Sequence, residues 1–110
     1  MDYLSEQEKR CLKLFRERVT KVLGSVVVQF RLFGSRVRGE SREDSDIDVL
    51  TLVTQKNTKI KNTVWDIAAD IQMDQDIAIS PLIMTVDEFA SLLKRERLIA
   101  LTIEREGICL

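Results

Sequence analysis

The stretch from Phe33 to Leu50 constrains the fold more than any other part of the chain. An apolar, strand-like run ends at Gly34-Ser35, a polar connection follows, and a second apolar run opens with Asp46 and Asp48. Residues two apart on a strand point to the same face, so the two carboxylates are expected on one face, with Ile47 and Val49 on the other. The sequence therefore predicts two neighbouring strands whose junction places a Gly-Ser turn near a pair of carboxylates.

Two carboxylates at this spacing repel each other unless a cation lies between them. Oxygen ligands on a rigid strand suit a hard divalent ion such as Mg²⁺, which keeps several waters and completes its shell with substrate phosphates. A solvated strand edge is the alternative interpretation of Asp46 and Asp48 taken alone.

The residues of the turn favour phosphate binding. Gly34 allows a close backbone approach, and Ser35 offers a hydroxyl and an N–H to a phosphate oxygen. Arg36 and Arg38 can neutralise polyphosphate charge. Each residue alone is typical of a plain turn or a solvated loop, so the indication comes from their combination.

This combination resembles the signature of a known family. The pattern consists of Gly34-Ser35, ten residues, and then Asp46-x-Asp48, with Arg36, Arg38-Gly39 and Ser45 between them. It is similar to that of the minimal nucleotidyltransferases of the DNA polymerase beta superfamily, in particular the MntA-like antitoxin type. The resemblance covers nearly the whole chain.

The resemblance implies a Mg²⁺-dependent transfer of AMP from ATP, with two metal ions. Asp46 and Asp48 would hold the ions, and Gly34 and Ser35 would bind the β- and γ-phosphates. A third carboxylate on the next strand would serve as metal ligand and general base. Asp76 is the candidate, Asp74 is the alternative, and a loop carboxylate without a role is the simpler interpretation.

The resemblance also suggests an acceptor, because a single small domain leaves little room for an acceptor site. Stand-alone members commonly accompany a helical toxin of the HEPN type, and the implied acceptor is a tyrosine of that toxin, as in a type VII toxin–antitoxin system. One alternative is a small-molecule nucleotidyltransferase that resembles the aminoglycoside-modifying enzymes and acts as a homodimer. Another is a non-catalytic module that neutralises the toxin by contact alone.

Composition narrows the possible classes of protein and of chemistry further. The 110 residues, 45% hydrophobic and 32% charged, can build one core, so we expect a single domain over residues 1–110. The net charge of -1 does not favour nucleic acid as a direct substrate. Cys11 and Cys109 lack metal-ligand spacing and there is no His, so neither zinc nor imidazole chemistry is indicated. Since no signal peptide or membrane-length apolar run is evident, we expect a cytoplasmic protein.

Hydrophobic periodicity predicts the remaining elements. Capping boxes at Ser5 and Thr85 predict the starts of two helices, and apolar residues at helical spacing from Ile60 predict another. A third strand is expected over Gln75–Met84. Pro81 within that strand indicates an edge or a bulge. The predicted fold is α/β, a small mixed sheet of three or four strands with helices packed on one face, similar to the palm of polymerase beta.

Overall fold

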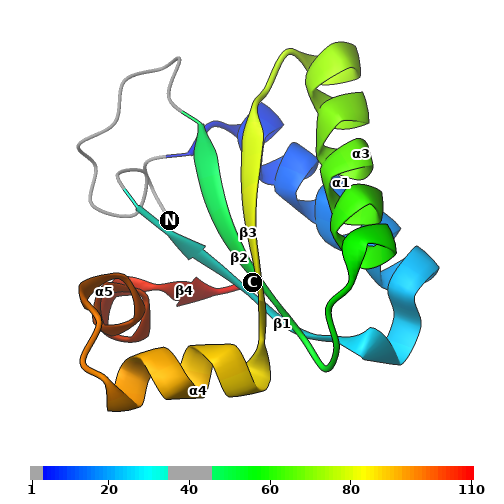
Figure 1. The fold of residues 1–110 in the computed structure, drawn as a ribbon. Coiled ribbons are helices and arrows are strands. Elements are labelled where there is room, and N and C mark those ends of the chain that lie inside the picture. Colours follow the sequence, from blue (N-terminus) through cyan, green and yellow to red (C-terminus); the bar gives the residue numbers. More distant parts are fainter. Residues whose placement is uncertain (1–3, 35–45) are drawn as a thin grey trace.

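The computed structural model describes residues 4–34 and 46–110, which form one mixed sheet with helices on both sides (Figure 1). The sheet has four strands in the order β3-β2-β1-β4. The α/β fold class is confirmed. The elements in chain order are α1 (Glu6–Leu23), η1 (Gly24–Val26), β1 (Val27–Phe33), β2 (Ile47–Val53), α3 (Thr58–Gln75), β3 (Ile79–Thr85), α4 (Val86–Lys94), α5 (Leu98–Glu106) and β4 (Ile108–Cys109).

The strand directions follow from the connections. β1 pairs with β2 in antiparallel fashion, and β2 pairs with β3 in parallel through the crossover helix α3. β4 adds a short antiparallel pairing to the other side of β1. β3 is therefore an edge strand, which confirms the prediction from Pro81, because proline cannot donate a backbone hydrogen bond to a further strand.

Two long helices cover one face of the sheet, as predicted. The buried side chains of α1 and α3 form one cluster with the strand residues Leu32, Ile47 and Val49. Phe15 of α1 meets Phe30 of β1 edge to face, with 5.9 Å between the ring centroids. The helical stripe predicted from Ile60 is buried in α3 through Ile60, Val64, Ala68 and Ile71.

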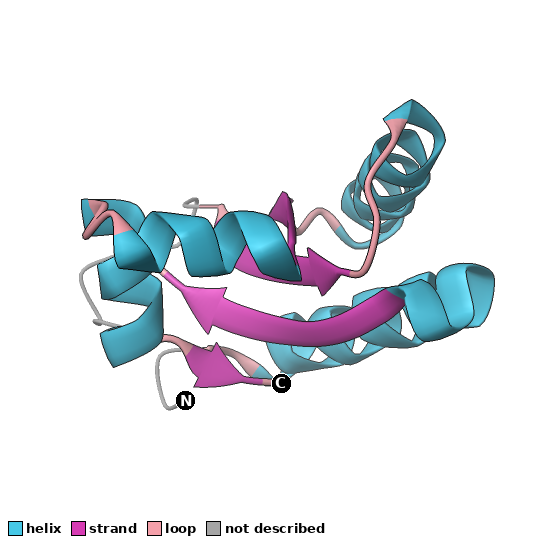
Figure 2. Ribbon diagram, turned by 60° about the horizontal axis from the view of Figure 1, so that its bottom comes forward, coloured by secondary structure: helices cyan, strands magenta, loops and turns pink. Residues whose placement is uncertain are grey.

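The structure adds a second helix pair on the opposite face. Leu50 and Leu52 of β2 pack with Phe89 of α4 and with Ala100 and Ile103 of α5. Figure 2 shows helices on both sides of the strands. The expectation of helices on one face holds for the two long helices, and the short C-terminal pair covers part of the other face.

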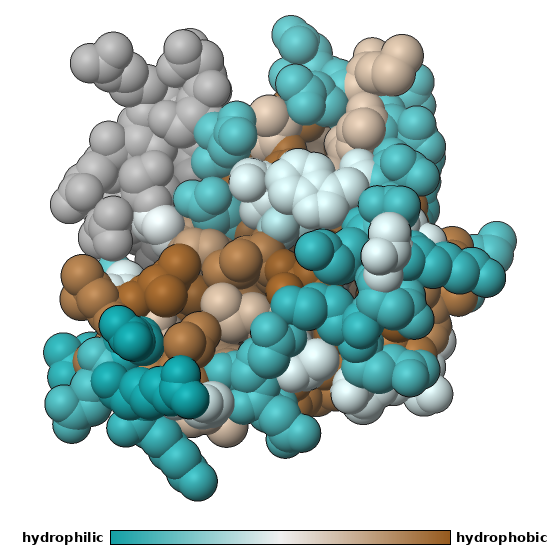
Figure 3. All heavy atoms as spheres, in the orientation of Figure 1, coloured by the Kyte–Doolittle hydropathy of each residue, from teal (hydrophilic) through white to brown (hydrophobic). Residues whose placement is uncertain are grey.

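The apolar residues of α5, near the C-terminus, are only partly buried. Leu98 is 79% exposed and Ile99 is 46% exposed, whereas Ala100 and Ile103 of the same helix are fully buried. Figure 3 shows apolar surface where α5 meets the sheet. None of the helices in the described ranges is both long and apolar enough to cross a membrane.

Local signals set the helix ends. Both predicted capping boxes are present, Ser5 with Glu8 at α1 and Thr85 with Glu88 at α4. Glu88 also forms an ion pair with Lys56, 2.9 Å from Nζ to Oε1, which links α4 to the connection between β2 and α3. Hydrogen bonding from the Thr85 backbone, followed by Lys56, lowers the pKa of the Glu88 carboxyl from its ordinary 4.5.

The lowered pKa of Glu88 predicts a pH-dependent contribution to stability. The ionised carboxylate stabilises the folded state above pH 4.5, and this contribution is lost as the pH falls through the lowered folded-state pKa. We therefore expect Glu88→Gln to lower the free energy of unfolding at pH 7 and to match the wild type at pH 2 to 3, as measured by urea denaturation. The loss at pH 7 should shrink in a Lys56→Gln background; an equal loss at every pH and in both backgrounds would contradict the assignment.

A buried hydroxyl gives a second stability prediction. Thr51 of β2 is completely buried, and its Oγ1 has no hydrogen-bond partner in the described structure. Because an unsatisfied buried polar group costs about 1 to 3 kcal/mol, Thr51→Val should stabilise the protein by about 1 kcal/mol in thermal unfolding. Thr51→Ser is the matched control, since it keeps the hydroxyl and removes a methyl group, and it should destabilise. A Val variant no more stable than the wild type would refute this prediction.

Candidate active site

The carboxylate pair lies where β1 ends and β2 begins. The antiparallel register pairs Phe33, the last residue of β1, with Asp48. Asp46 directly precedes β2 and is exposed, whereas Asp48 is half-buried. The structure therefore brings the two predicted metal-binding carboxylates to the end of the central strands, next to the glycine of the predicted turn.

Both the backbone conformation of Gly34 and its closeness to Asp48 require glycine at this position. Its backbone is left-handed, with φ +84°, a conformation that side chains rarely adopt. A Cβ at this position would also collide with Oδ2 of Asp48 and would lie 3.2 Å from Cγ of Asp48. The backbone of Gly34 thus lies against the Asp48 carboxylate, where only glycine leaves room for it. The close approach to a phosphate expected for Gly34 stays a prediction.

The electrostatics of the pair fit a divalent cation. Burial raises the pKa of Asp48 from its ordinary value of 3.8, and the neighbouring charge of Asp46 raises it further. Both causes are penalties on negative charge, and a bound cation would offset both. Oxygen donors and uncompensated negative charge are what Mg²⁺ prefers, so the residues present fit this ion.

β3 brings a further polar side chain to the same face. The parallel register pairs Asp48 with Ser80, and Ile47 N donates a 2.9 Å hydrogen bond to the Ala78 carbonyl. Paired residues of neighbouring strands point to the same face, so Ser80 lies beside Asp48. Ser80 was not predicted as a site residue, because its position beside Asp48 depends on the long-range register between β2 and β3.

The strand predicted from Gln75 begins later than expected. Gln75 is the last residue of α3, and Asp76 ends that helix in a left-handed conformation with φ 56° and ψ 37°. Gln75 and Asp76 belong to the end of the helix and not to a strand, because the helical hydrogen bonding continues to Asp76 N, which donates to the Gln72 carbonyl at 2.9 Å. Within the described ranges, no three acidic or cysteine side chains form a metal-binding cluster. Asp74 likewise belongs to α3, where it is exposed.

Three predicted nucleotide-binding residues cannot be placed. Ser35, Arg36 and Arg38 lie outside the described residues. Their phosphate-binding role stays a prediction from the sequence.

Comparison with known proteins identifies the family of this site. Residues 9–104 match the model of the nucleotidyltransferase domain. The chain belongs to this nucleotidyltransferase family. A curated relative from Methanocaldococcus jannaschii, named "Putative protein adenylyltransferase MJ0141", is 38% identical over 73 residues, which are 66% of this chain and 74% of the relative. The resemblance stated from the Gly-Ser and Asp-x-Asp pattern is confirmed.

Solved structures share the fold. One described as a minimal nucleotidyltransferase is 25% identical, with a TM-score of 0.57 and coverage of 92% of this chain and 94% of its own. Another, a toxin–antitoxin with AMP-PNP, is 18% identical, with a TM-score of 0.57 and coverage of 96% and 72%. The mixed sheet with its crossover helix is therefore the minimal nucleotidyltransferase fold.

The contact between Gly34 and Asp48 can be tested in this nucleotidyltransferase. Gly34→Ala should displace the Asp48 carboxylate, weaken Mg²⁺ binding about tenfold in calorimetry, and lower stability by about 1 to 3 kcal/mol because of the strained backbone. Gly24→Ala is the matched control: Gly24 also has positive φ, +56°, but a Cβ there would meet nothing within 4 Å. The control should lose stability and keep its Mg²⁺ affinity. Equal Mg²⁺ affinity of both variants would show that the contact does not position the carboxylate.

Proposed function

We propose that this protein transfers AMP from ATP to a hydroxyl group of a partner protein, in a Mg²⁺-dependent reaction. The observation that carries the proposal is the pair Asp46 and Asp48, held on one face beside Gly34, with the pKa of Asp48 raised by burial and by its neighbour. The family supports nucleotidyl transfer, and the name of the relative from M. jannaschii supports a protein as acceptor.

The reaction requires an acceptor oxygen to attack the α-phosphorus of ATP. The new O–P bond forms as the bond between the α-phosphorus and the bridging oxygen breaks, pyrophosphate leaves, and the acceptor proton passes to a base or to water. Bound Mg²⁺ would lower the pKa of the acceptor hydroxyl and neutralise charge on the phosphates. Asp46 and Asp48 would hold the metal, and Asp48, fixed between β1 and β3, would keep its carboxylate in place.

The other site residues have proposed roles from the sequence. Gly34 and Ser35 would face the β- and γ-phosphates, with Arg36 and Arg38 neutralising their charge. Asp76 remains a candidate for the third carboxylate. It ends α3 two residues before Ala78, whose carbonyl is bonded to Ile47 N, so its backbone lies at the same end of the sheet as Asp46.

We propose further that the acceptor is a tyrosine of a HEPN-type helical toxin, with this protein as the antitoxin. Structural neighbours described as toxin–antitoxin, one of them with AMP-PNP, motivate this choice.

The experiment combines this protein, ATP, Mg²⁺ and the product of the adjacent gene, followed by mass spectrometry of that product. The wild type should add one AMP to a tyrosine. Asp48→Asn should reduce the rate about a thousandfold, because losing about 4 kcal/mol of metal-dependent stabilisation costs that factor. Asp70→Asn, the same change at an exposed position of α3, should retain full activity.

Other outcomes would overturn the proposal in distinguishable ways. Normal turnover by Asp48→Asn would refute the carboxylate mechanism. A partner that is bound and inhibited without modification would indicate a contact-only antitoxin. A partner that is neither bound nor modified, together with transfer to an aminoglycoside, would indicate the small-molecule enzyme.

A further inference from the structure

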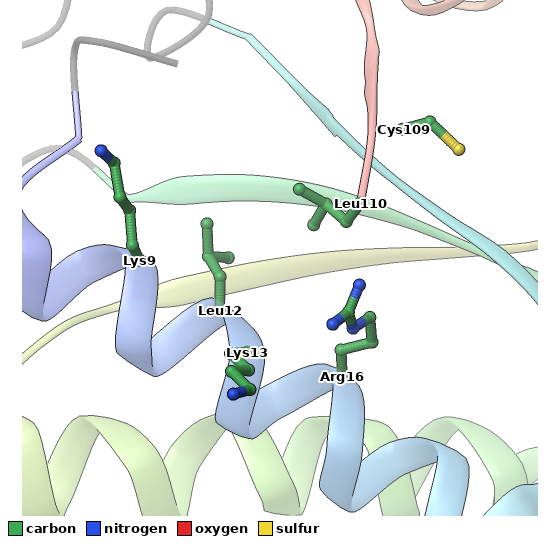
Figure 4. Close-up of a pocket in the computed structure, with 6 residues that line it drawn as sticks. All are labelled: Lys9, Leu12, Lys13, Arg16, Cys109 and Leu110. Carbon is green, nitrogen blue, oxygen red and sulfur yellow. The ribbon is translucent and has the colours of Figure 1, made fainter.

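A hollow of about 260 Å³ lies between α1 and the end of β4, away from the carboxylate pair. Figure 4 shows its lining, which comes from α1, from Cys109 of β4 and from Leu110, the residue after that strand. The lining residues are Lys9, Leu12, Lys13, Arg16, Cys109 and Leu110.

The hollow has an apolar floor and a cationic rim. Leu12 is buried in the core, and Leu110 packs against the same core cluster. Lys9, Lys13 and Arg16 follow one another at spacings of four and three residues, so they lie along one side of α1. In Figure 4 the guanidinium of Arg16 extends from the helix toward Leu110.

The cations of the rim are available to a partner. Lys9 Nζ lies 3.5 Å from Glu6 and Lys13 Nζ lies 4.0 Å from Glu17, both on the helix surface. Exposed pairs of this kind contribute little to stability, so an incoming carboxylate can replace them at little cost. Arg16 forms no ion pair with any residue in the described ranges.

The shape favours an extended segment over a small molecule. The hollow can hold one apolar side chain, and it opens into a neighbouring groove. A shallower groove of about 670 Å³ shares Arg16, Cys109 and Leu110 with it and continues past Thr20 to Val28 along β1. A chain lying in both would place one anchor in the hollow and its neighbours along α1.

We propose that this hollow docks an acidic segment of a partner protein, with one apolar side chain seated on Leu12 and Leu110 and carboxylates facing Lys9, Lys13 and Arg16. The inference rests on the proposed function in taking that partner to be the protein acceptor of AMP. Nucleic acid fits less well, because Phe30, the aromatic residue of the adjoining groove, is buried against Phe15, and because the chain has a net charge of -1.

The test uses a fluorescein-labelled peptide of alternating Glu and Asp with one central Leu, titrated with the full chain without ATP and followed by fluorescence anisotropy. The variant Lys9→Glu/Lys13→Glu should weaken binding at least tenfold. Lys59→Glu/Lys61→Glu on α3 is the matched control, since it makes the same charge change at two exposed positions and should bind normally. Replacing the peptide Leu by Gly should weaken binding about tenfold to a hundredfold, because a buried Leu contributes about 1.5 to 3 kcal/mol.

Amide chemical shifts locate the bound peptide. Changes confined to residues 9–21, 27–30 and 108–110 would support the proposal. No saturable binding, equal weakening by both charge-reversal variants, or tighter binding of a uridine oligonucleotide at the same amides would overturn it.

The transfer assay separates this inference from the proposed function. If both hold, Lys9→Glu/Lys13→Glu should raise the KM for the protein acceptor and leave kcat unchanged. Peptide binding without any AMP transfer would refute the proposed function alone, whereas transfer with an unchanged KM in this variant would refute the docking surface alone.

Discussion

The burial of β2 on both faces is the constraint on which the rest of the structure depends. Ile47, Val49 and Val53 face α1 and α3, while Leu50 and Leu52 face α4 and α5. Asp48 is the one residue of this strand that is not buried. Because β1 and β3 pair with β2 on either side, the backbone that carries Asp48 has little freedom, and the carboxylate is positioned before any ligand arrives.

Among the described residues, the helices on the second face of the sheet stop short of Asp48. The cluster made by α4 and α5 includes Leu50 and Leu52 but ends before Asp48. Phe33, paired with Asp48 in the sheet register, is only partly buried at the border of this cluster. The carboxylates therefore lie at the edge of an apolar surface, where the dielectric is lower than in open water and the attraction for a cation is stronger.

The parts of the site that sequence reasoning recovered depend on local rules. Strand alternation placed Asp46 and Asp48 close together, and the capping boxes predicted the starts of α1 and α4. Gly34 was singled out for a close approach to a ligand, and the structure shows a close approach to Asp48 instead. The predicted first residue of β3, Gln75, was wrong. The apolar stripe of α3 ends at Ile71, and no sequence pattern after it predicts the further helical turn that reaches Gln75. Whether Asp76 ends a helix or opens a strand is decided by how α3 and β3 pack against β2.

Long-range pairing also determines what sequence reasoning missed. Ser80 lies beside Asp48 only because β3 pairs with β2 in a particular parallel register. The packing of α4 and α5 on the second face includes contacts with β1 that are distant in sequence, namely the Arg31–Glu104 ion pair at 2.8 Å and the placement of the Arg31 guanidinium over the Phe89 ring. Periodicity within a helix shows that it has a buried face and does not show which face of the sheet covers it.

Helix α1 carries a net positive charge, whereas the rest of the chain carries a net negative charge. Glu6–Leu23 contains six Lys or Arg and three Glu, a net charge of +3, so the remaining residues carry -4 within the total of -1. The same helix buries Cys11, Leu12, Phe15 and Val19 beneath the strands that hold the carboxylates. A partner with an acidic segment would thus be attracted to one side of the chain and repelled by the rest, which orients it before contact. Since α1 is anchored to the sheet by these buried side chains, a partner held at the hollow would be held on the same framework as Asp46 and Asp48.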